Sequence, residues 1–314
     1  MESAIICKDV SIRYITGDFK DIGFKEFLMR KLTHNYKVNE FWADKNIGFE
    51  LKKGDMLGIV GSNGAGKSTL LKAISGVMIP TTGTIQVDGK IAALLELTAG
   101  FDGELTVREN TYLRGAMLGY TRDFMNQMYE SIISFAELEA FQDRPFKQLS
   151  SGMRSRLAFS IACLVNPDVL ILDEVLSVGD GAFKRKSGDK MKEILSSGVT
   201  GILVSHSMDQ VRELCNKVLW LDHGKQICFS DNVDLCIDAY EDFLVNKKVP
   251  SNKNDFIVMS ERYRAKLKLD KENKQKKEIE KLEEKIRSDN ENAVEAALNI
   301  IKKNRPDLLK ETNR

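Results

Sequence analysis

The chain has 314 residues, of which 42% are hydrophobic and 30% charged, and this composition excludes a disordered or fibrous protein. The sequence lacks a run of about 18 apolar residues and has no charged and then apolar N-terminal stretch, so we expect neither a membrane span nor a signal peptide. The five cysteines form no CxxC pair, which argues against a zinc site and fits a reducing cytosol.

The net charge of +1 is unevenly distributed along the chain. Residues 247–314 hold 19 Lys and Arg against 13 Asp and Glu, whereas acidic residues outnumber basic ones in the rest. This shift, with a change of pattern after Asn246, predicts a body over residues 1–246 and a charged tail over 247–314. We expect the tail to be helical or partly disordered.

Residues 17–40 interrupt the regular pattern of the body. Within them, FKDIGFKEFLMRKL (19–32) places Phe19, Ile22, Phe27 and Leu28 roughly on one helical face, with basic residues elsewhere. This spacing predicts an amphipathic helix. Two interpretations are open, a surface helix packed on its own domain and a helix that contacts a membrane partner.

Strands alternate with helices through the body. MLGIV (56–60) precedes a helix near Lys67, and VLILD (169–173) and GILVS (201–205) each follow a helical segment. This order predicts a parallel sheet covered on both faces. Three shorter segments with DG or HG turns or alternating hydrophobicity predict antiparallel strands at the sheet margin: 46–51, 84–94 and 218–228.

GSNGAGKS (61–68) satisfies the pattern GxxxxGK[ST] between a strand and a helix, which indicates a phosphate-binding loop, or P-loop. Its small residues let backbone N–H groups surround phosphate oxygens at the positive end of a helix. We expect Lys67 to reach the β- and γ-phosphates of ATP and Ser68 to ligate Mg²⁺. The predicted ATP-binding residues of this loop are Gly61, Ser62, Asn63, Gly64, Ala65, Gly66, Lys67, Ser68 and Thr69.

The apolar run VLILDE (169–174) ends in two adjacent acidic residues. A buried carboxylate is costly unless it serves a cation or a reaction. We therefore expect Asp173 to hold Mg²⁺ and Glu174 to orient or deprotonate the attacking water.

In LSSGMRSRLAFSIACLV (149–165), serines and a glycine precede an apolar helical run, as at a helix N-cap. Followed by VLILDE, this segment resembles the signature motif of ABC ATPases. The resemblance implies an α/β P-loop NTPase fold with a mixed core sheet, an antiparallel β subdomain and a helical subdomain. It also implies a homodimer in which Ser150, Ser151 and Gly152 act in trans on the ATP bound by the opposite subunit.

Two more segments match the order of the ABC motifs. SVGD (177–180) occupies the place of the D-loop, with Asp180 as its acid. His206 directly follows the strand GILVS and resembles the switch histidine that contacts the γ-phosphate, so we assign it a catalytic role.

Two assignments within the resemblance remain open. Tyr14 resembles the aromatic residue that stacks on adenine, but Tyr36 and Trp42 are alternatives because of the insertion. No glutamine occupies the expected Q-loop region, where Glu96 or Leu97 stands. Glu96 is the better candidate for a metal contact because leucine cannot ligate.

The exact sequences of three motifs narrow the resemblance to one group of ABC ATPases. SSGMRSRLAFSIA, DEVLSVGDGAFKRK and LLELTAGFDGELTVREN together resemble the ATP-binding subunits of bacterial exporters of O-antigen, teichoic acid and related polysaccharides. In that group the insertion and the TAGFDGEL stretch lie near the transmembrane partner, which implies the same for residues 19–32 and 98–105. Alanine at Phe27 or Phe101 is then expected to uncouple transport and spare nucleotide binding.

The function implied is a homodimer on the cytoplasmic face of the membrane that binds two Mg-ATP and docks two copies of a separate permease, which contacts most of the glycan. An ABC subunit for drugs or lipids would share every ATP residue and is one alternative. A soluble ABC ATPase acting on nucleic acid or ribosomes is another. A tail of mixed charge is a poor phosphate-binding stripe, so nucleic acid is not expected.

Overall fold

The computed structural model describes residues 2–16, 39–94, 100–173 and 181–304. Nine strands within these residues form one sheet of order β4-β1-β2-β9-β8-β3-β7-β6-β5. The strands are β1 Ser3–Thr16, β2 Asn39–Lys52, β3 Met56–Val60, β4 Thr82–Val87, β5 Ile91–Ala93, β6 Val169–Asp173, β7 Thr200–Val204, β8 Lys217–Asp222 and β9 Lys225–Ser230.

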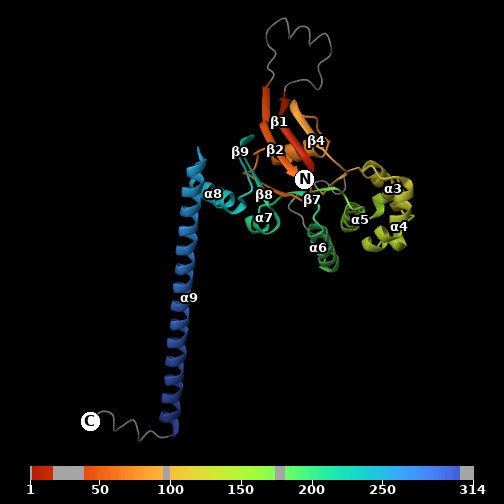
Figure 1. Cartoon of the computed structure of the whole chain (residues 1–314). Coiled ribbons are helices and arrows are strands. Elements are labelled where there is room, and N and C mark those ends of the chain that lie inside the picture. The colour runs from red at the N-terminus through yellow and green to blue at the C-terminus, as the bar shows by residue number, and fades with distance from the viewer. Residues whose placement is uncertain (1, 17–38, 95–99, 174–180, 305–314) are drawn as a thin grey trace, which may run out of the picture.

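Helices cover the sheet and extend from it on two sides (Figure 1). The α-helices are α2 Lys67–Ile74, α3 Val107–Met117, α4 Arg122–Ala136, α5 Ser151–Leu164, α6 Gly181–Ser196, α7 Met208–Leu214, α8 Val233–Asn246 and α9 Lys253–Asn304. Two short 3₁₀ helices, η1 Glu139–Phe141 and η2 Phe146–Gln148, lie between α4 and α5.

The sheet is mixed, as the sequence predicts. β3 runs parallel to β7 and β8, and β6 runs parallel to β5 and β7, while β1 is antiparallel to β2 and β4. Every residue of β3 and β7 is buried, which explains their continuous apolar sequence. The antiparallel pair expected at 218–228 is present as β8 and β9, but β8 lies inside the sheet beside β3.

The prediction for the segment 84–94 is confirmed for β4, which is an edge strand antiparallel to β1, and is wrong for β5. β4 and β5 lie at opposite ends of the strand order, and β5 pairs with β6 in parallel. The turn between them is held by Asp168 instead, whose carboxylate accepts a hydrogen bond from the Lys90 amide at 2.7 Å. Gly89 has φ +105 and lies against the Asp168 side chain, so the DG pair directs the chain toward β6.

Two buried clusters lie on opposite faces of the sheet. One joins α2 to the sheet and includes Ile59, Leu70 and Ile74. The other joins α5, α6 and α8 to the sheet and includes Phe159 and Phe183. A third cluster lies among α3, α4 and α5, where Tyr129 and Ile161 are buried, and it forms the core of a helical subdomain beside the sheet (Figure 1).

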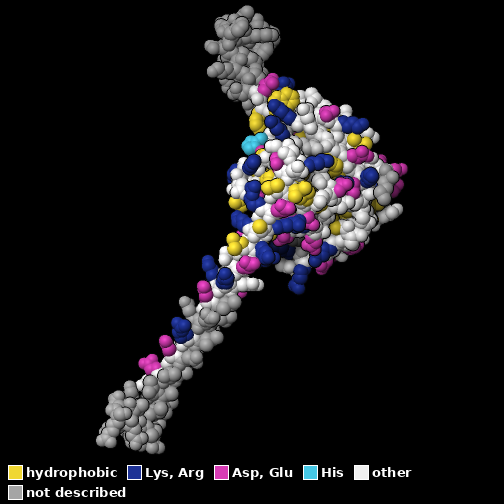
Figure 2. All heavy atoms as spheres, turned by 60° about the vertical axis from the view of Figure 1, so that its left-hand side comes forward, with side chains coloured by type: hydrophobic (Ala, Val, Ile, Leu, Met, Phe, Trp, Pro, Cys, Tyr) yellow, Lys and Arg dark blue, Asp and Glu magenta, His cyan; other side chains and the backbone are white. Residues whose placement is uncertain are grey.

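The charged tail contains one continuous helix, α9, which projects far from the body (Figure 1). Its first turns pack on the body, because Met259 and Ser260 are buried. Farther along, the described side chains are exposed and carry both charge signs (Figure 2). None of the helices in the described ranges combines the length and apolar composition needed to cross a membrane.

Residues 17–38, which hold most of the predicted insertion, lie outside the described part of the chain, and so do Phe27 and Tyr36. Asn39 and Glu40 begin β2.

Candidate nucleotide-binding site

The P-loop connects the end of β3 to the start of α2. Gly66 is the N-cap of α2 and has φ 109, a conformation that favours glycine. A Cβ at this position would also meet the Ala43 carbonyl oxygen at 2.8 Å and the carboxylate of Asp44. Only glycine therefore lets the loop lie this close to β2 and still turn into the helix.

Lys67 bends back over the loop from which it comes. Its ammonium nitrogen donates hydrogen bonds to the carbonyl oxygens of Gly61 at 2.6 Å and Ser62 at 3.1 Å. The Ser62 hydroxyl in turn donates to the Asp222 carboxylate at 3.4 Å. The positive charge is thus held at the loop, beside the N-terminus of α2, where an anion is favoured.

A pocket of about 340 Å³ lies over the P-loop. It brings together residues that the sequence analysis placed far apart in the chain, the loop, Tyr14 and His206. Its lining residues are Tyr14, Phe41, Ala43, Asn63, Gly64, Ala65, Gly66, Lys67, Ser68, Thr69, Val204 and His206. Gly61 and Ser62 do not line the pocket and contribute the carbonyl groups that hold Lys67.

Two aromatic side chains line the pocket. Tyr14 on β1 lies opposite Phe41 on β2, and both side chains are exposed, by 38% and 59%. Trp42 is the next residue along β2 and does not line the pocket, and its ring lies near Arg13 and Lys45. Sequence reasoning missed Phe41, although strand alternation places it on the face opposite to Trp42.

The strand register places the backbone of Asp173 beside a residue that lines the pocket. Asp173 is the last residue of β6 and pairs with Val204 of β7, which lines the pocket two residues before His206. The backbone therefore brings the predicted metal ligand toward the P-loop side of the sheet. Glu96, Glu174 and Asp180 lie outside the described residues, so their roles stay predictions.

The signature residues are not part of this pocket within one chain. Ser150 is the N-cap of α5 and its hydroxyl accepts a hydrogen bond from the Met153 amide at 3.2 Å, as the sequence predicts. Ser150, Ser151 and Gly152 are all exposed. They are thus on the surface at a helix N-terminus, a position from which they can meet a group outside their own chain.

Asp44 is a second residue that sequence reasoning missed. Its side chain is fully buried behind the P-loop, and within the described structure neither carboxylate oxygen has a hydrogen-bond partner. Burial raises the pKa of Asp44 to about 7. An uncompensated carboxylate therefore lies directly behind the loop that is expected to bind phosphates.

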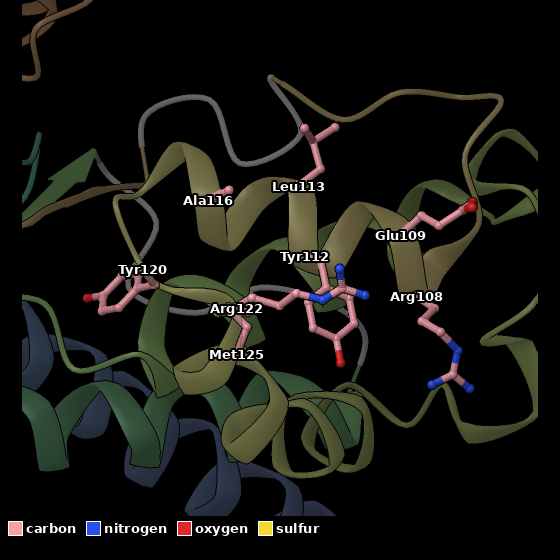
Figure 3. Close-up of a pocket in the computed structure, with 8 residues that line it drawn as sticks. All are labelled: Arg108, Glu109, Tyr112, Leu113, Ala116, Tyr120, Arg122 and Met125. Carbon is pink, nitrogen blue, oxygen red and sulfur yellow. The ribbon is translucent and has the colours of Figure 1, made fainter.

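A larger cavity of about 450 Å³ lies in the helical subdomain (Figure 3). Its lining comes from α3, from the start of α4 and from the segment between them: Arg108, Glu109, Tyr112, Leu113, Ala116, Tyr120, Arg122 and Met125. It shares no residue with the P-loop pocket. This cavity is larger than the P-loop pocket, but its lining includes no glycine-rich helix N-terminus for phosphate binding.

Comparisons with known proteins agree with the geometry of the P-loop pocket. The family model for ABC transporters matches residues 45–177. The chain is 39% identical over 227 residues to the O-antigen export system ATP-binding protein RfbB of Klebsiella pneumoniae, covering 72% of this chain and 92% of that protein.

Two further comparisons concern a longer relative and a solved structure. The chain is 40% identical over 236 residues to the teichoic acids export ATP-binding protein TagH of Bacillus anthracis, covering 75% of this chain and 43% of TagH. The chain spans about half the length of the first curated relatives it matches. A dimeric ATP-binding cassette in a post-hydrolysis state, bound to ADP and Pi, aligns with a TM-score of 0.52 at 22% identity, covering 72% of this chain and 97% of that one.

Proposed function

This chain belongs to the ABC transporter family, and from that premise we propose that it binds and hydrolyses ATP as the subunit of an exporter of a polysaccharide or lipid-linked glycan. The observation that carries the proposal is the pocket where Tyr14, the P-loop and His206 meet. The relatives named for O-antigen and teichoic acid export support a glycan as the exported class.

The residues of the pocket fit ATP and Mg²⁺. Gly64 has φ 79 and faces open space, since an added Cβ would meet nothing within 4 Å, so phosphate oxygens can approach the loop backbone. The Ser68 hydroxyl and the Asp173 carboxylate are oxygen ligands of the kind that Mg²⁺ prefers. When bound, Mg²⁺ neutralises charge on the phosphates.

The chain's own residues then take separate parts in hydrolysis. Lys67 binds the terminal phosphates, and its present hydrogen bonds to the loop carbonyls keep its charge at the site where they bind. Glu174 orients the attacking water, and His206 contacts the γ-phosphate from the end of β7. The base that orders this water, Glu174, directly follows the metal ligand Asp173 in the chain.

We assign the signature residues to a second copy of the chain. Ser150 and Gly152 are exposed at the N-terminus of α5 and lie outside the pocket of their own chain, which favours an arrangement in trans. Two chains would then enclose two ATP molecules. The proposed assembly adds two copies of a transmembrane permease and lies at the cytoplasmic face of the membrane, with the glycan contacted mainly by the permease.

The catalytic assignment is tested with Glu174→Gln. We expect ATP affinity to be retained, phosphate release to stop and the ATP-bound chain to shift toward a dimer in light scattering. Glu213→Gln, a change of an exposed residue on α7, serves as the matched control and should hydrolyse ATP normally. Wild-type turnover by Glu174→Gln would refute the assigned base, and a monomer at every nucleotide concentration would refute the arrangement in trans.

The exported class is tested in cells of the source organism. Depletion of the chain should remove one glycan from the cell surface, and a transmembrane protein should co-purify with the chain. An unchanged surface glycan profile after depletion would contradict export of a polysaccharide while leaving the ATPase assignment intact.

A further inference from the structure

His206 lies in the short segment between β7 and α7, and hydrogen bonds hold the residues on both sides of it. Ser205, directly before His206, is buried, and its hydroxyl oxygen accepts a hydrogen bond from the Ser207 amide at 3.0 Å. The same hydroxyl donates to the side-chain oxygen of Gln210 at 2.9 Å. The two neighbours of His206 are therefore joined to each other, and Ser205 is also joined to α7.

The contacts of Gln210 differ from those of an ordinary helix cap. Ser207 is the N-cap of α7, and its hydroxyl accepts a hydrogen bond from the Gln210 amide at 3.4 Å, which is one half of a capping box. In an ordinary capping box, the side chain three residues after the N-cap accepts directly from the amide of the N-cap residue. Here that amide donates to Ser205, whose hydroxyl stands between it and Gln210. Gln210 therefore fixes the residue before His206 as well as the start of the helix.

Helix α7 is itself fixed on the sheet. Val211 is fully buried and packs against Gly58 of β3, where an added Cβ would lie 2.5 Å from a methyl carbon of Val211. Strand β3 leads directly into the P-loop. The helix that holds His206 and the loop that is expected to bind phosphates thus rest on the same strand.

Helix α7 is also held by α8, through Arg212. The Arg212 guanidinium donates hydrogen bonds to Asp234 at 2.7 Å and to Asp238 at 2.6 Å. The Asp238 side chain is only 5% exposed, and it also accepts from Ser260 and Arg264 of α9 at 2.7 and 2.5 Å. A buried carboxylate that loses a charged partner is strongly destabilising, so this contact keeps α7 in place.

From this fixed segment His206 reaches the P-loop pocket. His206 and Val204 both line the pocket, whereas Ser205 between them is buried. A displacement of about 1 Å at a catalytic group can cost roughly 100-fold in rate. The hydrogen bonds of Ser205 and Ser207 limit such a displacement, because they restrict the backbone on both sides of His206.

We propose that Gln210 is a positioning residue for His206, which it holds toward the γ-phosphate through Ser205 and Ser207. The proposal rests on the proposed function, since it concerns the same ATP site. Gln210 does not line the pocket, so it acts on the reaction only through His206.

The first test is Gln210→Met in the full chain, which keeps the length of the side chain and removes the oxygen that accepts from Ser205. We expect kcat for ATP hydrolysis to fall about three- to tenfold, the effect of one hydrogen bond, with KM for ATP and affinity for ADP unchanged. The matched control is Gln142→Met, which removes the acceptor of a 2.8 Å hydrogen bond from the Tyr129 hydroxyl in the helical subdomain. The control should lose a similar amount of thermal stability and keep the wild-type kcat.

The second test asks whether Gln210 acts through Ser205. Ser205→Ala removes the hydroxyl that joins Gln210 to the Ser207 amide, and should lower kcat by a similar factor. The double variant should lose little more than either single variant, because both changes break the same chain of hydrogen bonds. Gln210→Glu keeps an acceptor oxygen for Ser205 and should restore most of the kcat lost in Gln210→Met.

The proposal is overturned by a wild-type kcat in Gln210→Met, or by an equal loss of kcat in Gln142→Met. Strictly multiplicative effects of Ser205→Ala and Gln210→Met would also overturn it, as would a kcat in Gln210→Glu no higher than in Gln210→Met. A wild-type kcat in His206→Ala would leave Gln210 with no catalytic group to position. Failure of the proposed function is distinguishable, because the wild-type chain would then hydrolyse no ATP, whereas failure of this proposal leaves wild-type hydrolysis intact.

Discussion

The ammonium nitrogen of Lys67 lies 2.6 Å from the carbonyl oxygen of Gly61, so the first and seventh residues of the P-loop are joined across the loop. The backbone of the loop therefore helps to position the lysine. Preorganisation of this kind reduces the ordering cost of binding an anion.

Replacement of Lys67 by methionine keeps the length of the side chain and removes the charge. We expect ATP affinity to fall by about 10- to 100-fold, the effect of one or more charged hydrogen bonds, in a fluorescence titration. Lys72→Met, in the last turn of the same helix and outside the pocket, should bind ATP like the wild type. Equal losses in both variants would show that Lys67 acts only through helix stability.

Tyr14 and Phe41 face each other across the β1/β2 pair and should both contact the adenine ring. Alanine at either position is expected to weaken ATP binding by about 5- to 100-fold, since stacking of one base contributes roughly 1–3 kcal/mol. Binding of tripolyphosphate, which lacks the base, should not change. Trp42→Ala is the control, and a selective loss of ATP binding in that variant alone would assign the adenine contact to Trp42.

These predictions differ in how far the sequence could support them. The P-loop and its strand–helix context are local patterns, and the parallel order of β3, β6 and β7 follows from the alternation of strands and helices. Phe41 was missed because alternation within β2 does not show which of its faces lies beside Tyr14. That depends on how β2 pairs with β1, and the local sequence does not determine this register.

The other failures come from contacts that are distant in sequence. The DG pair before β5 is a good turn signal, but the partner of a three-residue strand is chosen by Asp168 and β6, about 80 residues later. The sequence likewise contains the carboxylate of Asp44, whereas its burial against Gly66 depends on how β2 packs behind the P-loop. Tertiary structure, not local pattern, gives both residues their surroundings.

Phe101 lies in the stretch expected to adjoin the permease, and it also has a structural role. Its ring stacks on Phe146 with ring centroids 4.6 Å apart. Phe101→Ala should therefore lower the thermal stability of the helical subdomain moderately, and reduce transport per ATP hydrolysed in membranes containing the permease, with ATP binding retained. Phe141→Ala, which removes a half-buried ring from the same cluster, is the control for stability. Equal losses of transport in both variants would contradict a specific coupling role.

Because Asp44 is buried, we expect the stability of the folded chain to depend unusually on pH. Its pKa is raised by burial to about 7, so between pH 4 and 7 the folded chain keeps a proton that the unfolded chain has lost. Its contribution to stability is therefore greatest below pH 4, declines as the pH rises from about 4 to about 7, and is lowest above pH 7. A difference of about three pKa units corresponds to a loss of roughly 3–4 kcal/mol at pH 8.

Asp44→Asn removes the ionisation and keeps the shape of the side chain. We expect the variant to exceed the wild type in free energy of unfolding by roughly 3 kcal/mol at pH 8, with a much smaller difference at pH 5, in urea titrations at both values. Asp189→Asn, at an exposed position on α6, should differ from the wild type by less than about 0.5 kcal/mol at either pH. A difference between Asp44→Asn and wild type that does not change from pH 5 to pH 8 would mean that this carboxylate stays ionised, with solvent or ions reaching it behind the P-loop.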